Sequence, residues 1–280
     1  MKSKRLIRDL GIDFLKNKTK KEIENIIYLG DGVYFLGEIN GTNFITYQDL
    51  LEKLWGKRRF TNDMFVDLKE DEITGGNWLY FADSKYRNGE KTRFFLIAKK
   101  PILKCVPWNF FRESSCVYGL DILGPLNHSA SVNSLDILGP LSHSISIEEK
   151  EYIARLPQGI NNFSLTNNKH KINFLEDVEK QKNASEWDRT IVALVKSYLL
   201  QYDWLKDLNS EAIKDPSEVV LGAGDGQWTL CQEFVEDANT VCLRGSGLLK
   251  TIKGAANFSR ISKSSNEYIA GYRPVLELKI

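Results

Sequence analysis

Apolar residues recur along this chain at two spacings, which predict helices in some segments and strands in others. After Ser185, apolar side chains return every three or four positions, and this spacing predicts a helix that Ser185 caps. Its apolar positions are Trp187, Ile191, Leu194, Val195, Tyr198 and Leu199. The helical spacing indicates that Trp187 belongs to the core.

Residues 1–74 contain two weaker helix signals. Residues 18–28 have apolar positions at helical spacing, and residues 48–55 carry a stripe of leucines that ends in a tryptophan. Thr46 or Thr42 is expected to cap the second helix. We interpret residues 1–74 as a small α+β region for attachment or packing.

Asn40-Gly41 separates two apolar segments that favour strands. The segments are 32–39 and 43–47, and an Asn-Gly pair between such runs is a signal for a two-residue turn. We therefore predict a β-hairpin whose turn is Asn40-Gly41.

A second hairpin is predicted just after Gly75-Gly76, where a second region begins. Residues 78–81 and 92–98 are apolar and flank Asn88-Gly89, again a turn signal. Pro101 follows the second strand, which it cannot extend as a hydrogen-bond donor.

The C-terminal part of the chain predicts short strands joined by long loops. Short apolar runs alternate with clusters of Gly, Ser and Asn, and residues 227–231 form one such run. Residues 272–280 alternate and are rich in Val, Leu and Ile, so we expect a terminal strand paired inside the core. The fold class predicted from these elements is α+β.

The composition gives no support for binding to nucleic acid or anionic lipid through net charge, and it excludes few other functions. Charged residues make up 27% of the 280 residues, and the formal net charge is +1, so no overall field favours nucleic acid or anionic lipid. The basic start at residues 1–5 lacks the apolar core of a signal peptide, and no apolar run is long enough to span a membrane. We expect synthesis in a cytoplasm.

The four cysteines, Cys105, Cys116, Cys231 and Cys242, are expected to be buried thiols. A disulfide between Cys231 and Cys242 and a metal site are the alternatives. Neither pair has Cys-x-x-Cys spacing, and no histidine is close in sequence to either pair.

One segment is duplicated. Residues 120–129 recur almost unchanged at 135–144, and each copy is expected to be a short strand, a Gly-Pro turn and a polar tip. Two copies are too few for a solenoid, so we interpret residues 120–149 as a lengthened surface loop. The tips carry His128 and His143, which could bind a metal as a pair or contact a ligand; a recognition surface fits better than metal chemistry.

The order of weak motifs resembles C-type-lectin-like and formylglycine-enzyme-like domains, and most closely an uncharacterised set of proteins from phages and low-GC bacteria. The motifs include the Trp78 hairpin, Ser185-Glu-Trp-Asp188 and the closing segment Gly271-Tyr-Arg-Pro-Val-Leu-Glu-Leu278. The resemblance implies that residues 75–280 form a C-type-lectin-like domain with a central helix. It also implies that six residues define the fold: Trp187, Arg244, Gly245, Gly271, Tyr272 and Arg273.

Catalytic patterns are scarce in this sequence. There are three histidines and no Gly-x-Ser-x-Gly segment, and the formylglycine family's cysteine pair has no counterpart between Arg244 and Tyr272. The motifs of calcium-dependent lectins are also missing. We therefore expect no enzyme activity, no cofactor and no metal.

The polar, aromatic-punctuated segment after Gly245 is the predicted binding face, because Ser, Asn, Tyr and Arg suit adaptable recognition. The candidate ligand-binding residues are Trp228, Asn257, Arg260, Asn266 and Tyr268, with His128 and His143 in the duplicated loop. The hypothesis is a phage or prophage virion protein, in a tail fibre or surface appendage, that forms a homo-oligomer and binds a host-surface glycan or protein. The alternatives are a structural virion protein that contacts only other virion proteins, and, less favoured, a formylglycine-type modifying enzyme.

Overall fold

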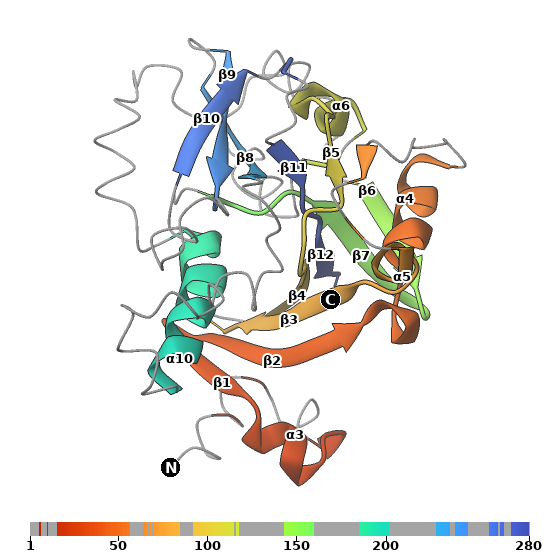
Figure 1. The fold of residues 1–280 in the computed structure, drawn as a ribbon. Coiled ribbons are helices and arrows are strands. Elements are labelled where there is room, and N and C mark those ends of the chain that lie inside the picture. Colours follow the sequence, from red (N-terminus) through yellow and green to blue (C-terminus); the bar gives the residue numbers. More distant parts are fainter. Residues whose placement is uncertain are drawn as a thin grey trace, which may run out of the picture.

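The chain forms a mixed α+β fold in which two mostly antiparallel sheets are joined by the C-terminal strands (Figure 1). It was analysed as a computed structural model. The structure describes residues 6, 10, 16–56, 64–65, 68, 70–84, 92–114, 116–117, 143–159, 185–201, 228–235, 239–245, 258–262, 264–265 and 270–279.

The larger sheet has seven strands, and all neighbouring strands are antiparallel. In spatial order they are β1 (Ile27–Gly30), β2 (Val33–Asn40), β3 (Asn77–Asp83), β4 (Arg93–Ala98), β12 (Val275–Leu278), β7 (Lys150–Arg155) and β6 (His143–Ile147).

The smaller sheet has five strands, and only its β8–β11 pair is parallel. In spatial order they are β10 (Phe258–Ser262), β9 (Thr240–Arg244), β8 (Trp228–Val235), β11 (Ala270–Tyr272) and β5 (Leu103–Lys104).

Short helices cover the two sheets. They are α3 (Lys20–Glu24), the 3₁₀ turn η1 (Gly41–Asn43), α4 (Tyr47–Trp55), α5 (Glu70–Thr74), α6 (Trp108–Glu113), the π-helix η4 (Asp188–Val192) and α10 (Ala193–Gln201). Figure 1 shows α10 beside β1 and β2, and α4 and α5 at the opposite end of the large sheet.

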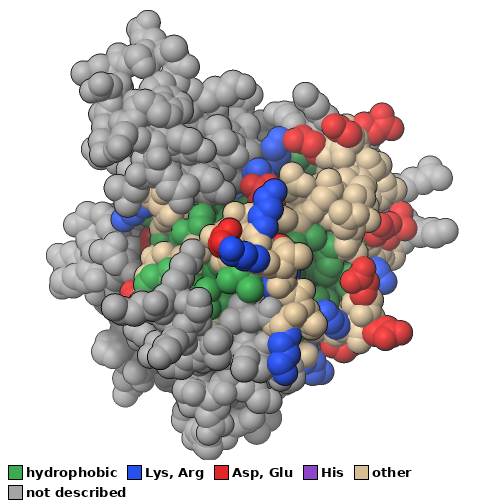
Figure 2. Space-filling view, turned by 90° about the horizontal axis from the view of Figure 1, so that it is seen from below, with side chains coloured by type: hydrophobic (Ala, Val, Ile, Leu, Met, Phe, Trp, Pro, Cys, Tyr) green, Lys and Arg blue, Asp and Glu red, His purple; other side chains and the backbone are tan. Residues whose placement is uncertain are grey.

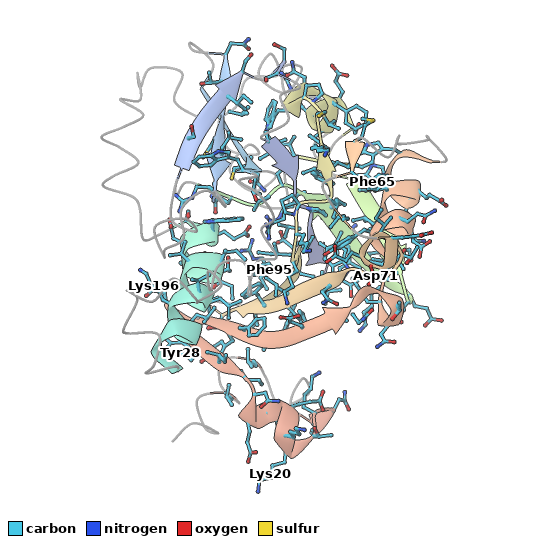
Figure 3. The ribbon with its side chains drawn as sticks, in the orientation of Figure 1. Lys20, Tyr28, Phe65, Asp71, Phe95 and Lys196 are labelled. Carbon is cyan, nitrogen blue, oxygen red and sulfur yellow. The ribbon has the colours of Figure 1, made fainter. Side chains whose placement is uncertain are left out.

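The large sheet has a buried apolar layer on each face because its side chains alternate along the strands. Phe81, Phe95 and Ile97 pack against Trp187 and the helix that follows it. On the other face, the core includes Trp78, Leu96 and Leu276 together with the leucines of α4. Figure 3 shows Phe95 in the interior of the molecule, whereas Lys20 and Lys196 lie at its surface.

Several predicted elements are confirmed. The helix after Ser185 buries Trp187, Ile191 and Leu194, and the hydroxyl of Ser185 accepts a hydrogen bond from the backbone N–H of Asp188. The helix 48–55 is present as α4, and its cap is Thr46. Strands β3 and β4 pair as predicted, but the turn Asn88-Gly89 lies outside the described residues.

The predicted terminal strand is divided between the two sheets. β11 belongs to the small sheet, and β12 lies in the middle of the large one, between β4 and β7. Arg273-Pro274 separates them, because Pro274 has no backbone N–H to continue a ladder. The terminal segment therefore connects the two sheets through β11 and β12.

The predicted hairpin at Asn40-Gly41 is wrong. β2 ends at Asn40, where η1 begins. The described residues 43–47 form no strand and lead into α4, while β2 pairs with β1 and β3 instead. The carboxamide of Asn40 accepts a hydrogen bond from Thr42 N–H, and Gly41 N–H donates to the Gly76 carbonyl at 2.7 Å. A Cβ at Gly41 would lie 1.8 Å from the carbonyl oxygen of Gly75, so this glycine permits close packing of two chain segments.

The helix predicted over 18–28 is shorter than expected. α3 is capped by Thr19 and ends at Glu24, and β1 begins at Ile27. Pairing of β1 with β2 therefore overrides the helical spacing of the last residues.

The sheet is continuous across the boundary that we expected at residue 74. β2, from the first region, pairs with β3 of the second along its whole length, and Tyr47 and Leu50 share a core with Trp78. β1 and β2 thus belong to the same sheet as β3 and β4, and α4 packs on the same core as Trp78.

Candidate functional site

Four strands of the small sheet begin or end at the same end of that sheet. Trp228 opens β8 and pairs with Ala270, the first residue of β11, while Arg244 closes β9 and pairs with Phe258, the first residue of β10. The segments before β8, between β9 and β10, and before β11 therefore meet the sheet at this end. We refer to it as the β8–β11 end.

The structure places only part of the predicted ligand set. Trp228 is half-buried and packs against the core. Arg260 lies on β10, opposite Cys242. The other candidates lie outside the described residues: His128, Asn257, Asn266 and Tyr268.

His143 is not part of the β8–β11 end. It opens β6 in the large sheet, and its Nδ1 lies 3.4 Å from the carbonyl oxygen of Ser114. The prediction that His143 and Ser144 form a polar tip is wrong. Both residues belong to β6, where they pair with Ala154 and Ile153 of β7. The first copy of the duplication lies outside the described residues.

The structure brings four of the predicted fold-defining residues together beneath the β8–β11 end. Arg244 donates to a carboxylate oxygen of Asp188 at the start of the helix, and both side chains are buried. Gly245 has φ +67°, and a Cβ there would lie 3.0 Å from the indole of Trp187. The end of β9 is therefore held against the first turn of the helix.

Arg273 completes this base from the terminal segment. Its guanidinium lies 5.6 Å from the centre of the Trp187 ring and donates to Thr229 Oγ1 and to the carbonyls of Ala98 and Lys99. Burial lowers the pKa of Arg273 to about 10, so the side chain is still a cation at neutral pH. Its contacts are those of a residue that fastens loops to the core, as expected for an arginine in a closing strand.

Gly271 and Tyr272 belong to β11, where they pair with Lys104 and Leu103 of β5. A Cβ at Gly271 would lie 2.6 Å from Pro101, and the ring of Tyr272 stacks on that of Phe111 with centroids 4.4 Å apart. Both residues are buried, which fits their predicted role in the fold.

A buried cluster of charged residues, which the sequence reading missed, lies between the large sheet and the helix start. We call Arg93, Arg155, Glu186 and Glu277 the buried ion cluster. Nη2 of both arginines contacts Glu186 Oε2, at 2.9 Å from Arg93 and 2.6 Å from Arg155. Arg155 Nε also donates to Glu277 Oε2 at 2.7 Å.

Asp83 and Arg189 extend the cluster toward solvent. Arg189 Nη1 lies 2.8 Å from Asp83 Oδ2, and the Arg189 side chain is 20% exposed. Counting Arg93, Arg155 and Arg189 against Asp83, Glu186 and Glu277, the extended cluster is electrically balanced. This balance explains why so many charges can be buried, since an unpaired charge would be strongly destabilising.

Electrostatics keep Glu186 ionised. Burial opposes the ionisation of Glu186, but Arg155 and Arg93 outweigh it and hold the pKa at about 2. Burial also acts on Asp188, and here it raises the pKa despite the opposing effects of Arg244 and Ser185. The sequence did carry a signal: single charged residues interrupt apolar strands at Arg155 and Glu277.

The cysteines are free thiols. Cys116, Cys231 and Cys242 are buried and Cys105 is half-buried, and burial raises the pKa of Cys116 to about 12. Within the part of the chain that the structure describes, no group of three or more His, Cys, Asp or Glu side chains could hold a metal. None of the described helices is both long and apolar enough to cross a bilayer.

No protein-family model, no curated protein and no solved structure matches this chain.

Proposed function

We propose that this protein is a non-enzymatic recognition module on a C-type-lectin-like scaffold, and that it binds its ligand at the β8–β11 end. The role that fits best is adhesion in a phage or prophage virion, in a tail fibre or surface appendage, with a host-surface glycan or protein as ligand. The single observation that carries the proposal is the convergence of four strand ends over a rigid base.

The base is rigid because buried polar contacts fix it from two sides. Asp188 holds Arg244 at the end of β9, and Arg273 joins Thr229 in β8 to the carbonyls that follow β4. Recognition residues are commonly carried by loops on such a fixed scaffold. Trp228 is the first residue of β8, and Arg260 belongs to β10, so both candidate residues belong to strands that converge at this end.

The alternative, a structural virion protein, predicts a large apolar face on residues 1–74. Among the described residues the one exposed large apolar side chain is Tyr28, which is 40% exposed and whose ring packs against Tyr34. Figure 2, which views the molecule from below, shows charged side chains of both signs around the apolar ones. The recognition role is therefore the better supported of the two.

Binding of the purified protein to whole low-GC Gram-positive cells tests the proposal. The variant Arg260→Ala/Tyr268→Ala should lose saturable binding while its thermal unfolding stays unchanged. The matched control is Tyr28→Ala/Lys196→Ala, which removes an exposed aromatic on β1 and an exposed cation on α10, both outside the small sheet. A well-folded wild-type protein that binds neither cells nor a glycan panel would favour the structural alternative.

A further inference from the structure

β6 is the last strand of the large sheet, and within the described part of the chain nothing blunts its outer edge. No described residue pairs with its outer side, and its pairing with β7 runs from His143 to Ile147 without a bulge. Its sequence, His-Ser-Ile-Ser-Ile, contains no Lys, Arg, Asp, Glu or Pro. Soluble proteins usually blunt an edge strand with charge, proline or a bulge, because its free N–H and C=O groups are a template for pairing.

The other edges of the two sheets are less suited to pairing. β1 carries an irregularity between Tyr28 and Gly30, and β5 is two residues long and flanked by a bridge from Phe65. β10 contains Arg260. β6 is therefore the edge that another strand could extend with the least obstruction.

The side chains of β6 are compatible with a neighbouring strand on both faces. Ser144 and Ser146 are exposed and small, whereas Ile145 and Ile147 are buried on the face that packs against α4. An added strand would thus meet hydroxyl groups on one face of the sheet and continue the apolar core on the other.

We propose that two copies of this chain associate through β6, antiparallel about a two-fold axis at Ile145, so that their seven-stranded sheets join into one. In this register all five residues of β6 are paired. Ser144 of each copy faces Ser146 of the other, and the two Ile145 side chains face each other. Ser144 Oγ donates to Glu151 within its own copy, so in the pairing it would accept a hydrogen bond from the hydroxyl of the facing Ser146. A second copy is the favoured occupant because the strand is complementary to itself in this arrangement.

The ends of β6 are compatible with the same pairing. Ile147 of one copy faces His143 of the other, and β6 contains no Asp, Glu, Lys or Arg, so no like charges face each other within the paired strands. Glu148 and Glu149, in the turn after β6, have positive φ, 48° and 64°, as a tight two-residue hairpin turn requires. The turn is therefore compact and does not itself cover the outer side of β6.

Sedimentation velocity of the full chain, over a series of concentrations at low salt, tests the association. Wild type is expected to shift from monomer to dimer as concentration rises. Ser144→Lys/Ser146→Lys places lysines opposite lysines across the axis, and should weaken association on the order of tenfold or more. Ser144→Lys/Ser146→Glu places lysine opposite glutamate, and should restore it.

Asn17→Lys/Asn25→Lys adds the same charge at exposed positions that flank α3, outside β6 and its neighbour β7, and should leave association unchanged. Thermal unfolding of each variant checks that it is folded. A wild type that stays monomeric at every concentration overturns the proposal, as does equal association of the Lys/Lys and Lys/Glu variants. β6 and the β8–β11 end lie in different sheets, so cell binding by a monomer would separate failure of this inference from failure of the proposed function.

Discussion

Glu186 Oε2 lies 2.6 Å from Arg155 Nη2, although the two residues are separated by 31 positions and neither is more than 2% exposed. This contact holds the first turn of the helix onto β7, at the centre of the buried ion cluster. Because both groups have left water, each depends on the other for its charge compensation.

Replacing Glu186 should therefore be strongly destabilising. Glu186→Gln keeps the shape but leaves Arg155 and Arg93 without the carboxylate, and we expect unfolding to become easier by roughly 3–5 kcal/mol. Urea denaturation measures the change. Glu24→Gln, at an exposed pair with Lys20, serves as the control and should have no measurable effect. Equal stability of both variants would contradict a structural role for the cluster.

Stability should fall in acid through the same carboxylate. The pKa of Glu186 is lowered from 4.5 to about 2 by folding, so its contribution is complete above about pH 4.5 and is lost as the pH falls toward 2. In this window the folding equilibrium constant should drop by up to about tenfold per pH unit. Asp188, whose pKa is raised, contributes in the opposite direction.

The test compares denaturation of wild type and Glu186→Gln between pH 5 and pH 2. The variant should show a shallower dependence on pH, because it no longer carries this titrating group. Parallel curves for the two proteins would mean that another group controls the acid transition.

Gly245→Ala should destabilise the base of the proposed binding face. Gly245 has φ +67°, and the new methyl group would also lie 3.0 Å from Trp187. Gly56 has φ +69° with nothing within 4 Å, so Gly56→Ala isolates the backbone effect, which is on the order of 1 kcal/mol. We expect Gly245→Ala to cost clearly more than Gly56→Ala in thermal unfolding; equal losses would show that contact with Trp187 is unimportant.

Removal of one copy of the duplication should be tolerated. The first copy lies between Val117 and His143. Val117 is fixed because its carbonyl accepts a hydrogen bond from Leu156 N–H, and His143 is fixed by the β6–β7 pairing. Loop-closure entropy changes slowly with length, so deletion of residues 120–134 should alter stability by less than about 1 kcal/mol. Differential scanning calorimetry would detect a larger loss, which would indicate that the first copy packs against the core.

The cysteines should react in the order of their burial. Cys105 is half-buried, whereas Cys116 is buried and its pKa is raised to about 12, so its thiolate is scarce at neutral pH. Alkylation followed by mass spectrometry should label Cys105 first in the native protein and all four cysteines after denaturation. Early labelling of Cys116 would argue for an open path to that thiol.

Local pattern was sufficient for several elements. Thr46 and the leucines of α4, Ser185 and Trp187 in the helix start, and the apolar strands β3 and β4 all follow spacings that a few neighbouring residues define. Local pattern failed at Asn40-Gly41, because Gly41 packs closely against the backbone of Gly75, a residue distant in sequence.

By itself, the sequence determined that α4 and the helix after Ser185 are helical, that β3 and β4 are extended, and that residues 275–278 form a core strand, because periodicity and capping are local properties. Only the tertiary structure decided that β12 lies between β4 and β7, that Arg155 and Glu277 meet Glu186 beneath the helix, and that β6 remains an edge. These features depend on pairings between residues far apart in the chain, such as the 122 positions between Arg155 and Glu277. No local spacing encodes such a pairing, since it is selected by the combined burial of apolar surface and the mutual compensation of buried charge.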